Sequence, residues 1–144
     1  AAACDAAAAR GVSCAAIELS DDGSIVIGKT SDLLGPCAAV ILNALKELAG
    51  IDHELPLISP SALEPIQKLK TMYFGSRNPR LHTDETLIAL SISASTNPAA
   101  QKALDAMPKL RDCQLHCSNR LSKVDLVTLR KLGLQVTMEP VHER

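Results

Sequence analysis

The residues Asp21-Asp22-Gly23-Ser24-Ile25-Val26-Ile27-Gly28-Lys29-Thr30 decide how this chain is interpreted. From Gly23 onward they match the P-loop pattern G-x-x-x-x-G-K-[ST], in which a flexible loop between a strand and a helix cradles phosphate. Here Ile25, Val26 and Ile27 are β-branched residues that favour a strand, and the Asp-Asp-Gly before them favours a hairpin turn. The stretch therefore predicts a turn and the second strand of an antiparallel hairpin rather than a nucleotide-binding loop.

The size and composition of the chain limit the classes of function. A length of 144 residues with 47% hydrophobic content is enough for one domain with its own core, so residues 1–144 are expected to be a single domain. Tyr73 and Phe74 are the only aromatic residues, which argues against nucleic-acid binding by base stacking. Neither a membrane-length apolar run nor a signal peptide is recognisable, so we expect a cytoplasmic protein that does not bind membranes.

The charge of the chain is unevenly distributed. Residues 1–64 carry three basic and nine acidic groups, a balance of −6, whereas residues 65–144 carry twelve and seven, a balance of +5. The densest basic segment contains Lys68, Lys70, Arg77 and Arg80. Such a segment can face an anionic ligand or an acidic neighbouring domain, or it can be solvated surface.

The cysteines indicate a reduced protein without metal. Cys4, Cys14, Cys37, Cys113 and Cys117 are odd in number and lack the spacing of a disulfide framework. Cys113 and Cys117 would lie roughly 13 Å apart on a strand, too far for one tetrahedral zinc site. We therefore expect five free thiols, no metal and no cofactor.

Hydrophobic periodicity and capping residues predict the element order αββαβαααβαβ. The segment 83–95 fits both a strand and a helix, and we favour a helix that Thr83 or Asp84 caps, because thirteen residues are long for a strand. The order implies an α/β fold: a mixed sheet with an antiparallel hairpin and crossover-connected parallel strands, flanked by helices on both faces. Helices are expected at 6–10, 36–49, after Ser61 as a cap, 83–95, 99–107 and 123–132, with strands at 12–19, 24–28, 55–59, 113–117 and 134–138. Asn97 is expected to cap the helix at 99–107, with Pro98 at its first position.

Polar side chains gather at the corner between the hairpin and the helix expected at 36–49. Lys29, Thr30 and Ser31 follow the strand there, and the amino end of a helix attracts a phosphate or a carboxylate. The alternative is that Ser31 caps a local turn while Lys29 is solvated. We take all three as candidate ligand-binding residues.

A second polar group flanks the helix expected at 83–95. Ser95, Thr96 and Asn97 follow it, and their side chains can bind a ligand or can serve close packing and local hydrogen bonds. His82 precedes the helix and is a candidate acid–base group, or else a loop residue, because no nucleophile is identifiable beside it. No catalytic residue can be named from the sequence, and enzymatic activity stays an open question.

Four stretches of the chain carry a family resemblance: Ile27-Gly-Lys-Thr-Ser-Asp-Leu-Leu-Gly35 and residues 42–51, 58–70 and 86–104. Together they resemble the C-terminal region of the bacterial uncharacterised protein family 0371, over about residues 11–140. Members of that family are several times longer and carry a separate Gly-rich stretch upstream. The resemblance therefore implies a missing N-terminal region, which we expect to be a partner of this domain, and it implies no particular chemistry.

The element order is also similar to a cytidine-deaminase-like layout, but the residues do not support that reaction. Deaminases need His-x-Glu and Pro-Cys-x-x-Cys to hold zinc. Here His82 is followed by Thr83 and Asp84, and Cys117 is followed by Ser118-Asn119-Arg120. The sequence leaves two hypotheses: a contribution to a site for an anionic or nucleotide-like ligand, shared with the N-terminal region, or a structural or homo-oligomerisation domain without a site of its own.

Overall fold

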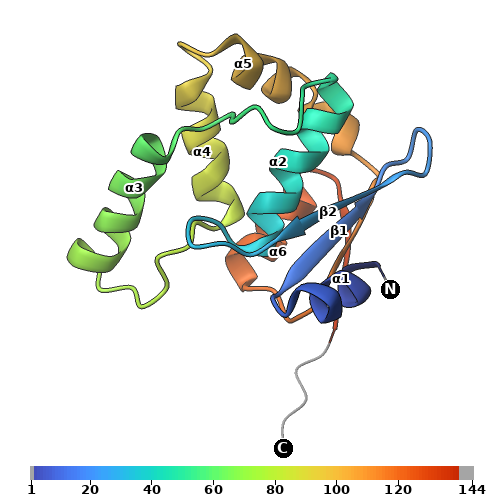
Figure 1. Ribbon diagram of the computed structural model, residues 1–144, viewed down its shortest axis with the longest axis horizontal. Coiled ribbons are helices and arrows are strands. Elements are labelled where there is room, and N and C mark those ends of the chain that lie inside the picture. Colours follow the sequence, from blue (N-terminus) through green and yellow to red (C-terminus); the bar gives the residue numbers. More distant parts are fainter. Residues whose placement is uncertain (1, 140–144) are drawn as a thin grey trace, which may run out of the picture.

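A computed structural model describes residues 2–139 and contains a four-stranded sheet with six α-helices (Figure 1). A π-helical turn, η1 (Leu69–Tyr73), extends α3, and a 3₁₀ turn, η2 (Met107–Leu110), follows α5. The helices are α1 (Ala2–Arg10), α2 (Pro36–Ala49), α3 (Pro60–Lys68), α4 (Thr83–Ser93), α5 (Pro98–Asp105) and α6 (Lys123–Lys131), and the strands are β1 (Cys14–Glu18), β2 (Ile25–Lys29), β3 (Gln114–Cys117) and β4 (Gln135–Met138).

The sheet is mixed, as the sequence predicts. Its strand order is β2-β1-β3-β4. β1 pairs antiparallel with both β2 and β3, whereas β3 and β4 are parallel and are joined by the α6 crossover. The hairpin and the crossover unit therefore meet at the β1–β3 pairing, in the middle of the sheet.

The hairpin confirms the interpretation of the P-loop-like stretch. Gly23 lies in the turn with a φ of 72° and donates its N–H to Leu19 O at 2.9 Å, and Ile25, Val26 and Ile27 pair with β1. At Gly28 the backbone of α2 passes so close that an added Cβ would lie 2.2 Å from Val40 N. The second glycine of the pattern thus allows a helix to pack on a strand, and the stretch does not form an anion-wrapping loop.

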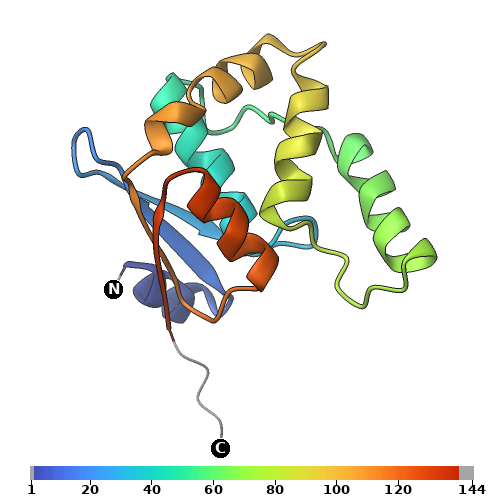
Figure 2. The same cartoon turned by 180° about the vertical axis from the view of Figure 1, so that it is seen from behind.

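Helices cover the two faces of the sheet unequally. α2 packs on β1 and β2, α6 packs on β4, and α4 and α5 pack on α2, so most of the helices lie on one face. The short α1 lies alone on the other, with α6 on the opposite side of the sheet (Figure 2). The core lies on the crowded side, where Ile17 of β1 meets Ile41 and Leu45 of α2, all fully buried. Much of the α1 face stays open.

Two sequence predictions are wrong between α2 and α4. Residues 55–59 form no strand, although Leu57 and Ile58 are buried. The helix that follows begins at Pro60 with Ser59 at its N-cap, so Ser61 lies inside its first turn. Proline suits the first position of a helix because it has no N–H to leave unpaired and its φ is already helical. The likeness to the deaminase layout, which included a strand at 55–59, is unconfirmed.

The helix prediction for 83–95 is confirmed by α4, but the cap is neither Thr83 nor Asp84. His82 occupies the N-cap position of α4, and its backbone N–H donates to Glu85 Oε1 at 2.8 Å. Asn97 caps α5 as expected, with its Oδ1 accepting from Ala99 N at 3.0 Å.

Across residues 2–139 every helix is too short or too polar to cross a bilayer.

Candidate functional site

A cleft of about 310 Å³ opens where β2 and β3 end. Its walls come from the segment after β2, the starts of α2 and α6, the segment before α4 and the segment after β3. Residues from these five segments and Ser13, just before β1, line it, namely Ser13, Thr30, Gly35, Pro36, Cys37, Asn78, Arg80, Leu81, His82, Cys117, Asn119, Arg120, Leu121, Ser122 and Asp125. The carboxyl ends of strands are where open α/β sheets commonly bind ligands.

The amino ends of α2, α4 and α6 all reach this cleft. At two of them a side chain already accepts a hydrogen bond from a backbone N–H group. Ser122 caps α6, with its Oγ accepting from Asp125 N at 3.2 Å. The α4 end is held by Asp125, whose Oδ1 accepts from Thr83 N at 2.8 Å. A carboxylate from a neighbouring helix therefore sits on the positive end of α4, where anions are stabilised.

The amino end of α2 is open by contrast. Gly35 stands at its N-cap and offers no side-chain acceptor, and its first turn contains no acidic residue. Pro36 lacks an N–H, so the donors that this end directs outward are the amides of Cys37 and Ala38. Uncapped amides at a helix amino end attract an anion through hydrogen bonds and through the helix dipole.

The charged side chains of the cleft favour an anion in front of α2. The Asp125 carboxylate also accepts from Ser122 Oγ at 3.1 Å and lies 3.4 Å from His82 Nδ1, so these partners lie at the starts of α6 and α4 and not at the start of α2. Arg80 and Arg120 are the two cationic side chains on the lining, and Arg120 is exposed. Arg80 Nε donates to Ser31 O at 2.6 Å, which fixes the direction of that guanidinium.

Two buried thiols, Cys37 and Cys117, lie at the base of the cleft. A hydrogen bond between them lowers the pKa of the Cys117 thiol, and the same bond together with burial raises the pKa of Cys37. The pair therefore gives up one proton more readily than the second. All five cysteines are free thiols, as the sequence predicts.

The predicted ligand-binding residues are divided between two places. Thr30 and His82 line the cleft. Lys29 is exposed at the end of β2, outside the lining, and Ser31 Oγ accepts from Leu33 N at 3.3 Å and Leu34 N at 3.1 Å, which is the local-turn alternative.

The other predicted residues lie at the far end of α4. Ser95, Thr96 and Asn97 follow that helix, whereas His82 precedes it, and an 11-residue helix is about 16 Å long. Ser95 Oγ donates to Ile92 O at 2.8 Å, and Asn97 caps α5 while its Nδ2 donates to Leu57 O at 3.4 Å. Ser95 and Asn97 thus have structural partners, and none of the three residues lines the cleft.

Sequence reasoning missed Asn119, Arg120, Asp125 and the cysteine pair. The first two were considered only as departures from a deaminase motif, although they follow a predicted strand with a crossover helix behind it. The rule that ligands bind beyond the carboxyl ends of parallel strands would have pointed to that segment.

The sequence of the whole chain, residues 1–144, matches the family described as domain of unknown function DUF1846, C-terminal. The chain belongs to this family. It is 57% identical to a UPF0371 protein of Corynebacterium glutamicum (strain R), over 90% of this chain and 26% of that protein. A UPF0371 protein of Corynebacterium efficiens is 58% identical over 88% of this chain and 26% of its own length. The more distant UPF0371 protein of Streptococcus sanguinis is 47% identical over 96% of the chain and 28% of its own length.

These matches confirm the resemblance to the C-terminal region of family 0371. The chain spans about a quarter of the length of the curated relatives it matches. The descriptions of the family and of these relatives assign no activity to them. What the domain does must therefore be inferred from its own residues.

Proposed function

We propose that this domain forms one wall of a site for an anionic, phosphate-bearing ligand, and that the remainder of the longer protein completes the site. The uncapped amino end of α2 carries the proposal. The positive end of a 14-residue helix opens on the cleft there, with Gly35, Pro36 and Cys37 on the lining and no carboxylate in the first turn. The equivalent end of α4 is occupied by the Asp125 carboxylate, so the same fold already places an anion on a neighbouring helix.

The two arginines extend this anion site. A guanidinium matches the geometry of a phosphate because it donates two parallel hydrogen bonds to it. Arg80 is held by Ser31 O and by Asn78 Oδ1, which accepts from Arg80 N at 3.1 Å, so its orientation is set before a ligand arrives. Arg120 is exposed and extends the positive surface on the other side. Thr30 and His82 add a hydroxyl and an imidazole to the same lining.

The residues of the cleft suit the phosphate end of a ligand better than a base. Both aromatic residues of the chain, Tyr73 and Phe74, lie outside the lining, so this wall offers nothing on which a nucleobase can stack. A nucleotide-like ligand would therefore place its phosphate here and its organic part against the rest of the protein.

Free thiols are typical of a reducing compartment, which supports a cytoplasmic location.

A structural or oligomerisation role is the second candidate, and one surface favours it. Met72, Tyr73 and Phe74 are 69%, 69% and 74% exposed at the end of η1, although they are among the more apolar side chains of the protein. Exposed apolar groups that lie together often mark a protein–protein contact. A second copy of the chain or the N-terminal region could cover them without any ligand site being present.

The phosphate proposal is tested by titrating the full-length protein with inorganic phosphate and pyrophosphate in a calorimeter. Arg120→Ala is expected to weaken binding roughly 10- to 150-fold, because a charge-assisted hydrogen bond contributes about 1.5 to 3 kcal/mol. Arg130→Ala is the matched control, since Arg130 is an exposed arginine on the last turn of α6 and lies outside the cleft. It should bind phosphate as the wild type does.

Two results would count against the ligand site. Absence of phosphate and pyrophosphate binding by the wild-type protein would favour the structural role. Equal affinities in the wild type and in Arg120→Ala would show that any anion binds elsewhere in the longer protein. A thermal melt of each variant is required alongside, so that a loss of binding is not mistaken for a loss of fold.

A further inference from the structure

Three potential metal ligands meet on the opposite face of the sheet from the cleft: Cys4 of α1, His116 of β3 and Glu139, which directly follows β4. Cys4 Sγ lies 3.2 Å from Glu139 Oε1 and 3.9 Å from His116 Nε2. His116 Nε2 lies 2.9 Å from the same Glu139 oxygen. The three donor atoms therefore lie close to one another, and none of the three residues belongs to the proposed phosphate site.

The fold accounts for this arrangement. β3 and β4 are parallel neighbours in which His116 is level with Thr137, and the ladder continues where Glu139 N donates to Cys117 O at 3.1 Å. Because side chains alternate along a strand, Thr137 and Glu139 face the same side of the sheet as His116. α1 lies over that side and supplies Cys4 from its first turns.

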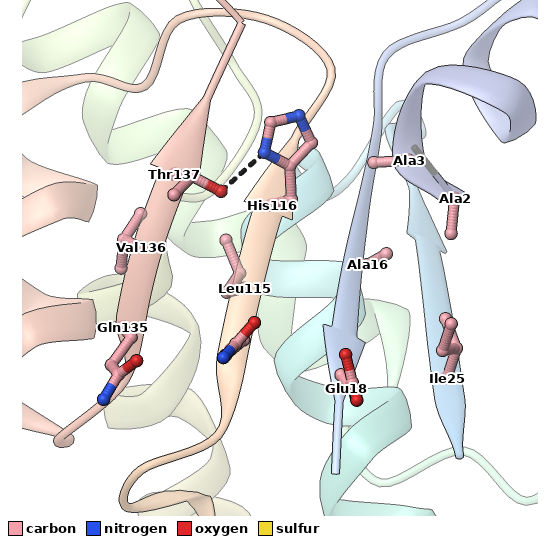
Figure 3. Close-up of a pocket in the computed structure, with 11 residues that line it drawn as sticks. Ala2, Ala3, Ala16, Glu18, Ile25, Leu115, His116, Gln135, Val136 and Thr137 are labelled. Carbon is pink, nitrogen blue, oxygen red and sulfur yellow. Dashed lines mark hydrogen bonds between the residues drawn. The ribbon is translucent and has the colours of Figure 1, made fainter. Parts of the chain in front are cut away.

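The histidine ring is already oriented as a ligand would be. Its Nδ1 lies 2.6 Å from Thr137 Oγ1, and Figure 3 shows this bond with the second ring nitrogen directed away from Thr137. Metal-bound histidines commonly use the other ring nitrogen in such a bond, which fixes the ring and its tautomer. The contact leaves Nε2 free to face Cys4 and Glu139.

We propose that Cys4, His116 and Glu139 bind a zinc ion. One thiolate, one imidazole and one carboxylate form a donor set that zinc accepts, with bond lengths of about 2.0 to 2.3 Å. Tetrahedral angles at those lengths place neighbouring donor atoms roughly 3.3 to 3.6 Å apart. The observed separations of 2.9, 3.2 and 3.9 Å bracket that range, so the ion fits after shifts of a few tenths of an ångström.

Zinc binding would displace one proton, that of the Cys4 thiol. In the metal-free arrangement the Cys4 thiol donates to the Glu139 carboxylate. On binding, the thiol proton leaves to solvent and the thiolate, the neutral imidazole and the carboxylate coordinate the ion. Three protein ligands leave the fourth tetrahedral position to a water molecule, as in catalytic zinc sites. Of the three ligands, His116 also lines a hollow of about 520 Å³ on this open face of the sheet (Figure 3).

The test measures zinc binding by the full-length protein after chelator dialysis, in competition with a chromophoric chelator. Cys4→Ala and Glu139→Gln are each expected to weaken one zinc site by more than about 100-fold, because loss of a partner that only orients a ligand already costs roughly 10- to 100-fold. Thr137→Val tests that orienting partner and should fall within this smaller range. Cobalt substitution should give a thiolate charge-transfer band in the wild type that Cys4→Ala lacks.

His53→Ala provides a matched control. His53 Nε2 lies 3.0 Å from Glu47 Oε2, so this exposed pair repeats the histidine–carboxylate part of the cluster without a thiol. The variant should bind zinc as the wild type does. The proposal is overturned if Cys4→Ala and Glu139→Gln match the wild type in stoichiometry and affinity, or if the wild-type cobalt protein shows no thiolate band. The three side chains would then form a hydrogen-bonded cluster only.

Discussion

Gly28→Ala is expected to destabilise the domain by about 3 kcal/mol or more, because the new methyl group overlaps backbone that has little freedom to move. Its Cβ would lie 2.2 Å from Val40 N and 2.5 Å from Val40 Cα. Asn43 Nδ2 adds to the restraint by donating to Ile27 O at 3.0 Å, which ties α2 to β2 one residue away. Either α2 must move off the sheet or β2 must leave its pairing with β1.

Gly35→Ala is the matched control for this prediction. Gly35 has an ordinary φ of −68°, and its added Cβ would meet only Leu81 O at 3.7 Å. The cost there should stay within about 1 kcal/mol, the scale of a change at a helix cap. Hydrogen exchange of β2 and α2 peptides in the full-length protein, followed across a urea series, separates the two variants. Equal protection in Gly28→Ala and the wild type would contradict the predicted clash.

Local residue chemistry predicted the elements of this fold well. Asp21-Asp22-Gly23 before three β-branched residues specified the hairpin, and Asn97-Pro98 specified the start of α5, because each signal depends on neighbours in the chain. The mixed sheet followed from the predicted order of the elements. The glycine at position 28 could be placed on a strand but not against a helix, since that contact depends on how α2 crosses β2.

The failed strand at 55–59 has a physical cause that the apolar run concealed. Proline at 56 and 60 removes two N–H donors, and Leu57 and Ile58 obtain their burial by packing into the core cluster without a strand partner. Asn97 Nδ2, 40 residues away, donates to Leu57 O. A buried segment can thus satisfy a carbonyl through a side chain, and hydrophobicity alone does not distinguish it from a strand.

The candidate sites were the least predictable part of the protein, because they depend on contacts between distant residues. Asp125 accepts a hydrogen bond at the start of α4 from a residue 42 positions away in the sequence. Cys4 donates to Glu139, which is 135 positions away. Strand alternation correctly separates the two faces of β3, so it places His116 on one side and Cys117 on the other. Strand alternation does not indicate which helix covers each face. The covering helix decides that His116 lies beside Cys4 and that Cys117 lies beside Cys37.

Lys70 illustrates the same limitation and leads to the second large expected effect. The sequence placed it in a basic segment that can face an anionic ligand, but its side chain is only 9% exposed. Its Nζ donates to Arg80 O at 2.6 Å and to Glu85 Oε1 at 2.8 Å, and that Glu85 oxygen also accepts from His82 N. Lys70 therefore joins η1 to the segment that carries Arg80 and His82 into the cleft.

Lys70→Ala is expected to cost about 3 kcal/mol, near the lower end for breaking a buried ion pair, because the Glu85 side chain keeps 25% exposure to water. Lys68→Ala, two residues earlier on an exposed face, should change stability by less than about 0.5 kcal/mol. Thermal melts and urea unfolding of the two variants provide the comparison, and equal stabilities would show that the Lys70–Glu85 pair contributes little.

Because the same bonds position Arg80, Lys70→Ala should also weaken phosphate binding under conditions where it remains folded, whereas Lys68→Ala should not. A destabilised Lys70→Ala protein with unchanged phosphate affinity would separate the fold of this segment from the proposed site.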